Sequence, residues 1–535
     1  MKKILLTIFL SFLLVTSLYS QEGLQKVKIS DFSGGQVSAF LDDTLEMNQG
    51  ESFKNVVLNK KGQLSTRKGQ DIFVVDIGNT AFTGIGRYDS DATTSYMIVA
   101  SGTSIIRAEP AYTSWSTVKH SSLTANKDTE FIQANNLYFV LNGTNPTSWL
   151  NGINWNGGTT GAASPPTATT GAWVLNYLFL SGDPAQPDWV YFSNNLVPET
   201  FTKATDLFKV NTGDGQAIQR IEPYRINELI IYKERSIYIL NATGSTPLSD
   251  WTLQPISRVT GTIAPRSVVS LGNDQWFLSS EPIAIRSLVR SEYDKILVNM
   301  VSTPIQDIFD GTADSSINLT QIAKSAGVLY DNKYLLAIPT GTSSVNNTVV
   351  VYDFISESWY LIDGWYPAAW IVYDENRLFY IDANDGRVIE CFTGTIGDYD
   401  EGPEASFASD PTVAISYEWI SKALDWDYPE NYKQADALEV EFDTTGNYTA
   451  TISIDLDNGG FQDIGTVNLA GDVVTLPELL PFTLASGGVA RKTFHLQRYG
   501  EFKKMQIKVT QSGLSERCIL QRVSGFAQIK PWRRE

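Results

Sequence analysis

The residue types that most often perform chemistry in proteins are scarce in this chain. Among 535 residues there are 2 His and 2 Cys, namely His120, His495, Cys391 and Cys518. A structural zinc site needs about four such ligands, and the spacing of these four matches no metal-binding motif. A Ser-His-Asp or Cys-His nucleophile would depend on one of two histidines. A single Cys391–Cys518 disulfide remains possible, but two cysteines cannot form a framework of several disulfides.

Carboxylates are abundant, yet their spacing selects no catalytic pair. The segment from Asp455 to Gly459 begins like a calcium loop, but Thr466 stands where a bidentate Glu is needed. We therefore predict a hairpin turn there, another turn at Asp89-Ser90-Asp91, and a solvated linker over 398–404. A glycosidase needs two carboxylates about 5–10 Å apart, and no pattern identifies such a pair.

The remaining motifs of enzymes are also missing. The chain has no P-loop, no GxGxxG between a strand and a helix, and no sialidase Asp-box. We expect His120 in a loop and His495 in a strand, both as structural or surface residues. The sequence predicts no catalytic, cofactor-binding or metal-binding residues, no cofactor, and a protein that is not an enzyme.

Charge and composition predict an ordered β protein. Asp and Glu number 59 against 41 Lys and Arg, which gives a formal net charge of −18 and argues against a basic surface that grips nucleic acid. The chain is 42% hydrophobic and only 19% charged, the reverse of a disordered chain. Thr, Ser, Val, Ile and aromatic residues favour strands, and one short helix is expected over 304–309. Five tryptophans beside apolar strands are expected in the core: Trp149, Trp155, Trp173, Trp189 and Trp359.

The first 20 residues have the layout of a secretory signal peptide. Met1-Lys2-Lys3 precedes an apolar run from Ile4 to Tyr19, and cleavage is expected after Ser20. The run is too short for a comfortable transmembrane span of about 20 residues, and no later segment is apolar enough for one. A mis-assigned start, or an apolar arm that packs in an assembly, is the alternative.

A short apolar strand led by Asn recurs along the chain. Six copies begin at Asn135, Asn176, Asn227, Asn273, Asn332 and Asn376, and a copy without the Asn covers 95–100. The leading Asn residues are 41, 51, 46, 59 and 44 positions apart, and a period of roughly 40–50 residues is typical of β-propeller blades. Asn also tolerates the left-handed conformation of a turn. We predict an all-β fold with a divergent β-propeller of six or seven blades over residues 75–400.

The two ends of the chain show sequence patterns that differ from the Asn-led repeat. Residues 21–74 are expected to form N-terminal strands and a hairpin. Beyond the linker, strands with clean alternation, such as Leu438-Val440-Phe442, indicate half-buried antiparallel sheets. We predict a β-sandwich-like platform domain over 401–535.

Several short motifs occur in an order that resembles the bacteriophage tail nozzle proteins, or tail tubular protein B family. They lie at 31–35, 55–58, 62–69, 149–155, 176–182, 191–201 and 232–238. This resemblance implies a structural component of a virion tail, with a propeller and a β-platform in each subunit. It also implies a ring, typically of six subunits, that closes the DNA channel, contacts adaptor and other tail proteins, and lets DNA pass on ejection without specific binding. An acidic lumen would suit that role, because it repels phosphate.

The signal-like segment indicates a second interpretation. A secreted, periplasmic or cell-surface bacterial β-propeller that binds glycan or protein would carry such a leader. A propeller glycosidase is a third and weaker interpretation.

Overall fold

The computed structural model describes residues 23–59, 62–74, 82–90, 94–108, 115–118, 123–152, 154–243, 247–291, 295–311, 315–373, 376–384, 386–394, 397–398, 413–470 and 488–531. The signal-like segment 1–20 lies outside them. The chain forms two compact units, Met1–Arg67 with Ala414–Glu535, and Lys68–Val413. No helix among the described residues is both long and apolar enough to cross a membrane.

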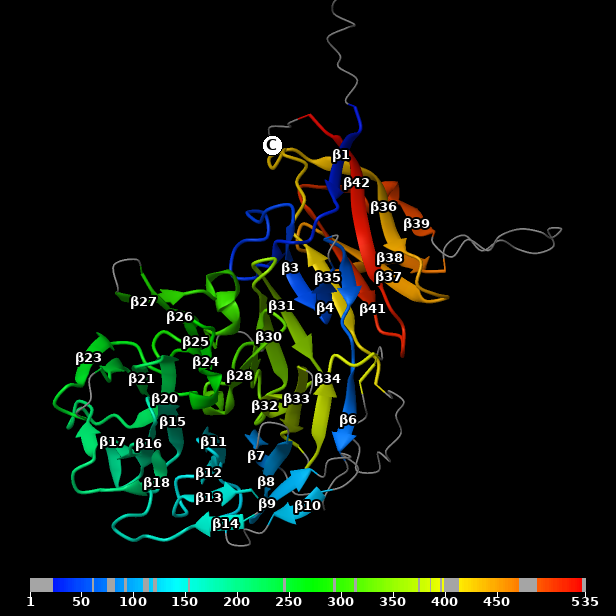
Figure 1. Cartoon of the computed structure of the whole chain (residues 1–535). Helices are drawn as coiled ribbons and strands as arrows, with labels where there is room; N and C mark the ends of the chain where they lie inside the picture. Colours follow the sequence, from blue (N-terminus) through cyan, green and yellow to red (C-terminus); the bar gives the residue numbers. More distant parts are fainter. Residues whose placement is uncertain are drawn as a thin grey trace, which may run out of the picture. The chain divides into compact units, whose positions relative to one another are not determined.

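The unit Lys68–Val413 is a β-propeller whose described strands make seven antiparallel blades (Figure 1). Blade 1 consists of β7 (Phe82–Asp89), β8 (Ser95–Ser101), β9 (Ser104–Ala108) and β10 (Trp115–Val118). Blade 2 consists of β11 (Glu130–Ala134), β12 (Leu137–Leu141), β13 (Ser148–Asn151) and β14 (Asn154–Gly157). Blade 3 consists of β15 (Thr170–Val174), β16 (Tyr177–Asp183), β17 (Gln186–Asn194), β18 (Val197–Phe201) and β19 (Leu207–Lys209). Blade 4 consists of β20 (Ile218–Arg225), β21 (Glu228–Lys233), β22 (Ile237–Asn241) and β23 (Thr252–Ser257).

Three further blades complete the ring. Blade 5 consists of β24 (Val269–Ser270), β25 (Gln275–Leu278), β26 (Ile285–Arg290) and β27 (Ile296–Met300), and it is preceded by the 3₁₀ turn η1 (Pro265–Ser267). Blade 6 consists of β28 (Ala326–Tyr330), β29 (Lys333–Ile338), β30 (Thr348–Asp353) and β31 (Ser358–Asp363). Blade 7 consists of β32 (Pro367–Tyr373), β33 (Arg377–Asp382), β34 (Val388–Cys391) and β6 (Gln70–Val74). The short helix expected over 304–309 is η2 (Thr303–Ile308), and η3 (Ile322–Lys324) follows it.

The first strand of each blade contacts the first strand of the next blade, and β32 contacts β7, so the ring is closed. Blade 7 takes its outer strand from the other end of the unit, because β6 pairs antiparallel with β34, with Val74 opposite Val388. The predicted all-β propeller of six or seven blades is therefore confirmed, with seven blades among the described strands.

The Asn-led repeat marks one position in the blades. In blades 2 to 7 each Asn lies in the hairpin that joins the first strand to the second, and the copy without Asn is β8 of blade 1. Asn135, Asn176, Asn332 and Asn376 have positive φ angles. Leu175 before Asn176 is also left-handed, as a two-residue type I′ hairpin requires. At these four positions Asn suits the turn because it adopts this conformation at low cost.

Tyrosines near the end of first strands join neighbouring blades. The Tyr88 hydroxyl donates to the carbonyl of Asn136 in the next blade, at 3.1 Å. Tyr224 donates to the carbonyl of Asn273 at 2.8 Å, and Tyr373 donates to the carbonyl of Ser95 at 2.9 Å. Each bond ties the first strand of one blade to the first hairpin of the following blade.

Aromatic and aliphatic side chains fill the layers between blades. Trp276 of blade 5 packs with Tyr334, Tyr352 and Trp359 of blade 6 at centroid distances of 5.3, 5.0 and 6.2 Å. Trp359 is buried, and Trp149, Trp155, Trp173 and Trp189 pack against buried clusters. The expected core role is confirmed for Trp359, whereas the other four are half-buried and pack against these clusters from their edges. Replacing a buried ring such as that of Trp359 by Ala costs about 3–5 kcal/mol.

The other unit is a β-sandwich built from both ends of the chain. One sheet contains β1 (Gln25–Ile29), β4 (Val56–Leu58), β5 (Leu64–Thr66), β36 (Lys433–Asp443), β39 (Val489–His495), β40 (Glu501–Phe502) and β42 (Ile519–Ile529). The other contains β2 (Gly35–Gln36), β3 (Gln49–Lys54), β35 (Tyr417–Ser421), β37 (Thr449–Leu456), β38 (Gln462–Asn468) and β41 (Met505–Gln511). The 3₁₀ turn η4 (Gln497–Tyr499) precedes β40.

The alternating residues Leu438, Val440 and Phe442 are fully buried between these sheets. The unit borders differ from the sequence-based segments 21–74, 75–400 and 401–535. Strands β1 and β5 pair with β42, so the N-terminal strands belong to the sandwich, while β6 belongs to the propeller. Of the expected linker over 398–404, only Asp398 lies among the described residues.

Candidate functional site

The first strands of the seven blades surround a cavity of about 550 Å³, which we call the central cavity. Small-molecule sites have volumes of this order. Every blade contributes to the wall. The lining residues are Ile85, Thr129, Glu130, Phe131, Ile132, Gln133, Gly171, Ala172, Trp173, Arg220, Glu222, Pro223, Arg266, Val268, Ala326, Gly327, Ala369 and Trp370.

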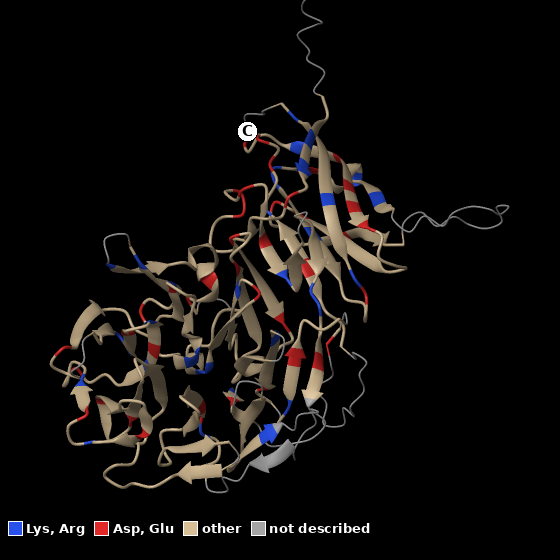
Figure 2. Cartoon of the chain, viewed as in Figure 1, with Lys and Arg blue, Asp and Glu red and all other residues tan. Residues whose placement is uncertain are grey.

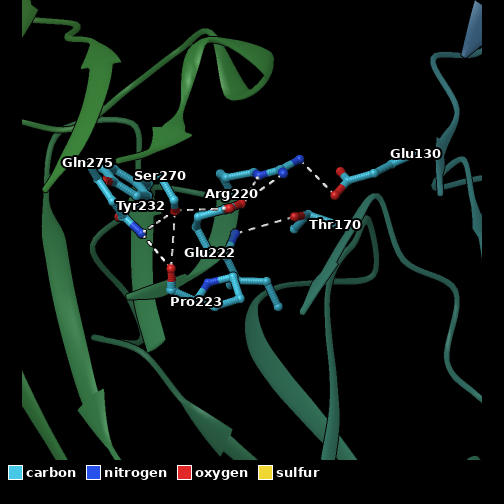
Figure 3. Close-up of polar contacts among 9 residues, drawn as sticks. Glu130, Thr170, Arg220, Glu222, Pro223, Tyr232, Ser270 and Gln275 are labelled. Carbon is cyan, nitrogen blue, oxygen red and sulfur yellow. Dashed lines mark hydrogen bonds and ion pairs between the residues drawn. The ribbon is translucent and has the colours of Figure 1, made fainter. Parts of the chain in front are cut away.

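A charged triad lies in this wall. Arg220 and Glu222 are two positions apart on β20, so they face the same side of the strand. The Nε and Nη2 atoms of Arg220 donate to Glu222 Oε2 at 3.1 and 2.8 Å. Arg220 Nη1 lies 2.7 Å from Glu130 Oε1 on blade 2. Figure 3 shows Arg220 between the two carboxylates. Blade 4 is thereby tied to blade 2 across blade 3.

The triad continues into blade 5 through neutral groups. Ser270 Oγ donates to Glu222 Oε1 at 3.3 Å. Gln275 Nε2 donates to Ser270 Oγ at 3.1 Å and to the Pro223 carbonyl at 2.8 Å. The Tyr232 hydroxyl donates to Gln275 Oε1 at 2.8 Å (Figure 3). Each polar group supports the next, so the carboxylate of Glu222 is held in a defined orientation.

Burial shifts the ionisation of the triad. The side chains of Glu130 and Arg220 keep 20% and 18% of their surface open, on the cavity side, while protein surrounds them elsewhere. Burial raises the pKa of Glu130 from 4.5 to about 7, and the nearby Arg220 offsets only part of this rise. Burial alone would lower the pKa of Arg220, but Glu130 and Glu222 raise it above its ordinary value. Glu130 is thus a carboxyl group that exchanges a proton near neutral pH.

Arg266 ties distant blades together on another part of the wall. It lies in η1, immediately before blade 5. Its Nη2 donates to the carbonyls of Thr83 and Thr129 at 2.7 and 3.3 Å, and its Nη1 donates to the Ala368 carbonyl at 3.3 Å. These acceptors belong to blades 1, 2 and 7 or to their immediate approaches. Asp128, 80% exposed, lies 3.4 Å from the same guanidinium.

No family model and no curated protein matches this chain. Solved structures do show similarity at 10–11% sequence identity. The extracellular domain of a hybrid two component system from B. thetaiotaomicron gives a TM-score of 0.43 at 10% identity, over 61% of this chain and 40% of that chain. The computationally designed Ika8 protein gives 0.36 at 11% identity, over 61% of this chain and 100% of that one. BamB from Moraxella catarrhalis gives 0.37 at 11% identity, over 69% of this chain and 97% of that one. The chain thus spans less than half of the first of these proteins.

The calcium-loop-like segment is the turn that joins β37 to β38. Asp457 and Asn458 both have positive φ angles. The carboxylate of Asp457 accepts the backbone N–H groups of Lys503 and Lys504 at 2.9 and 2.8 Å. Its oxygens therefore serve the turn itself, and the predicted hairpin turn is confirmed. The other predicted turn covers Asp89-Ser90-Asp91. Asp89 is the last residue of β7, and Asp91 lies outside the described residues.

The candidate His and Cys residues do not come together. His495 is an exposed residue at the end of β39, and His120 lies outside the described residues. Cys391 and Cys518 are both buried and are not joined in a disulfide, so the bridge that the sequence left possible is not formed. Burial raises the pKa of the Cys518 thiol well above its ordinary value. Within the described part of the chain, no three His, Cys, Asp or Glu side chains are placed to hold a metal ion.

Sequence reasoning missed the residues of the central cavity. The signal was present in β20, where Arg220 and Glu222 flank the fully buried Ile221. Charges at alternate positions of a strand lie on one face, and in a buried strand they need partners on that face. The partners Glu130 and Arg266 lie far away in the sequence, and only the ring arrangement brings them near.

Proposed function

We propose that this protein is a structural subunit of a bacteriophage tail, similar to the nozzle ring that closes the DNA channel and opens it on ejection. The observation that carries the proposal is the ordered set of nozzle-like motifs in a chain that folds as a propeller plus a β-sandwich. A propeller and a β-platform are the two parts that the family resemblance implies.

The motif residues support the proposal because they occupy positions that determine the fold. Phe32 is buried, with only 1% of its surface exposed. Asn55 has a positive φ angle. Its Oδ1 accepts from Arg67 Nε at 2.9 Å, and its Nδ2 donates to the Ser416 carbonyl at 2.8 Å. Residues with such roles are difficult to replace without loss of the local fold.

The motif over 232–238 has a similar role in blade 4. Lys233 is completely buried, and its ammonium donates to Asp214 Oδ1 and Oδ2 at 2.7 and 2.8 Å and to the Val210 carbonyl at 3.0 Å. Burial would raise the pKa of Asp214, but hydrogen bonds from Lys233 and Gln216 lower it below its ordinary value. The lysine therefore anchors the loop between blades 3 and 4.

The central cavity suits a structural role in which DNA passes elsewhere. Its volume is that of a small-molecule site, and Arg220 and Arg266 bond to groups of the protein itself. In the proposed ring, DNA would follow the axis between subunits without specific binding. Acidic residues lining that axis would repel phosphate, and mixed subunit faces would contact the adaptor, other tail proteins and neighbouring copies. Figure 2 shows Asp and Glu interspersed with Lys and Arg on both units.

A second candidate is a secreted, periplasmic or cell-surface bacterial propeller that binds glycan or protein. The basic and apolar segment of residues 1–20 favours it. The two candidates differ in assembly and in where the chain is found.

Mass spectrometry of purified phage particles and light scattering of the recombinant chain test the proposal. The full chain and the chain from residue 21 are compared, because the apolar start alone promotes association. We expect the protein in virions and a closed ring, typically of six subunits, in solution. A chain that is absent from particles, is cleaved after Ser20 and is monomeric in the periplasm or medium would overturn the nozzle proposal and support the secreted one.

A further inference from the structure

The central cavity has the properties of a binding site that the nozzle proposal does not use. The blades of a β-propeller surround a central channel, and the chemistry of its wall determines what can bind there. This cavity, of about 550 Å³, is lined in blades 6 and 7 by the small residues Ala326, Gly327 and Ala369. Ala369 is only partly buried, so a larger side chain at this position would narrow the cavity.

The polar groups of the wall favour a ligand without net charge. Arg220 and Arg266 contribute two positive charges, and Glu130 and Glu222 contribute two negative charges when both are ionised. The triad is already paired internally. A charged ligand would lose its hydration without gaining an uncompensated partner. A hydroxyl group both donates and accepts, so it can bond to a guanidinium and a carboxylate that lie side by side.

Aromatic residues form another part of the wall. Phe131, Trp173 and Trp370 line the cavity, and each is only partly buried. The indole N–H of Trp370 donates to the Ala326 carbonyl at 3.0 Å, which fixes the ring in place. Fixed aromatic rings offer large contact area at low entropic cost, and the C–H face of a sugar ring packs well on such a surface.

We propose that the central cavity binds a neutral, polyhydroxylated ligand of monosaccharide size. The aromatic residues take its C–H face, and the Arg220–Glu130–Glu222 triad takes its hydroxyls. The proposal is independent of the nozzle proposal, since a tail subunit or a secreted propeller could each use such a site.

Saturation-transfer NMR on the full chain tests this inference with glucose, galactose and N-acetylglucosamine as neutral probes. Glucosamine and glucuronate are the charged probes, and all are used at millimolar concentration. Ala369→Leu puts bulk into the cavity, and Ala185→Leu makes the same change at an exposed position. We expect signals from at least one neutral sugar with the unaltered chain and with Ala185→Leu, and at least tenfold weaker signals with Ala369→Leu.

Three results would overturn the proposal. They are the absence of binding by every neutral probe, equal binding by Ala369→Leu, and stronger binding of a charged probe than of its neutral counterpart. Circular dichroism melting shows whether Ala369→Leu is folded. If it is not, the smaller Ala369→Val replaces it, and the same outcomes apply. Ring formation by light scattering is measured separately, so failure of the ligand proposal leaves the nozzle proposal unaffected.

Discussion

Protonation of Glu130 should make the stability of the propeller fall as the pH rises through neutrality. In the folded chain the pKa of this carboxyl is about 7 rather than 4.5, because burial opposes its charge more than Arg220 favours it. Between these two values the folded state binds more protons than the unfolded state, so stability decreases with rising pH. The contribution is fully present below about pH 4.5 and is lost by about pH 7.5.

The size of the effect follows from the shift. A change of one pKa unit corresponds to about 1.4 kcal/mol, so the rise from 4.5 to about 7 corresponds to about 3.5 kcal/mol. Because 20% of the side chain is exposed, solvent screening reduces this to about 3 kcal/mol. For a unit as large as this propeller, the average entropy of unfolding converts that to a change in melting temperature of about 4 °C. Glu130→Gln keeps the shape of the side chain but cannot titrate, so the variant should not share this loss.

Calorimetric melting of the full chain between pH 4.5 and 8 measures the difference. We expect the melting temperature of Glu130→Gln to gain about 4 °C relative to the unaltered chain as the pH rises across this range. Glu281→Gln is the matched control, because Glu281 also faces an arginine but is 58% exposed, and such pairs contribute little.

Parallel curves for the unaltered chain and Glu130→Gln would refute the reasoning, since Glu130 would then be ionised throughout. Infrared difference spectra give a direct second measurement. A protonated carboxyl band that is missing in Glu130→Gln should disappear near pH 7 in the unaltered chain.

Three other predictions concern buried groups. Lys233→Met should destabilise the propeller by about 3–5 kcal/mol in urea unfolding, because it leaves a carboxylate without its buried partner; a loss below about 1 kcal/mol would contradict the anchoring role. Tyr224→Phe removes the hydroxyl whose single proton is shared between the carbonyls of Asn273 and Leu288 in blade 5 and should cost about 1–2 kcal/mol, whereas Tyr428→Phe at a 45% exposed site should cost almost nothing. Cys391 and Cys518 should not react with a thiol reagent in the native chain, and both should react in guanidinium without reductant; unreactive thiols after unfolding would indicate a disulfide.

Local signals made much of the fold predictable. The Asn before each repeated strand indicates a tight turn. Such a turn depends on only a few adjacent residues, as the left-handed Leu175 and Asn176 show. The alternation of Leu438, Val440 and Phe442 with polar residues likewise indicates a sheet with one buried face, and these three side chains are buried. The hairpin turn near Asp457 was predictable because the missing twelfth ligand is visible in the sequence.

Pairings between distant segments were not predictable in this way. Nothing in the β1 sequence identifies β42 as its partner, so the N-terminal strands could not be assigned to the sandwich. The triad depends on blade geometry that brings Glu130 opposite Arg220 across an intervening blade. Charge alternation indicates which way a side chain faces, but it does not indicate which residue it meets.

The use of β6 as the outer strand of blade 7 has a consequence for synthesis on the ribosome. The hydroxyl of Tyr380 in β33 donates to Gln70 in β6, and these two residues are separated by 310 positions. Thr66 and Cys518 in the sandwich are separated by 452. At about 5–20 residues per second, the early strands wait roughly 15–60 s or longer for their partners. Neither unit can be completed while the chain is still short. The edges of the early strands therefore stay unpaired during much of translation, and a chain cut before β32 would leave the ring open.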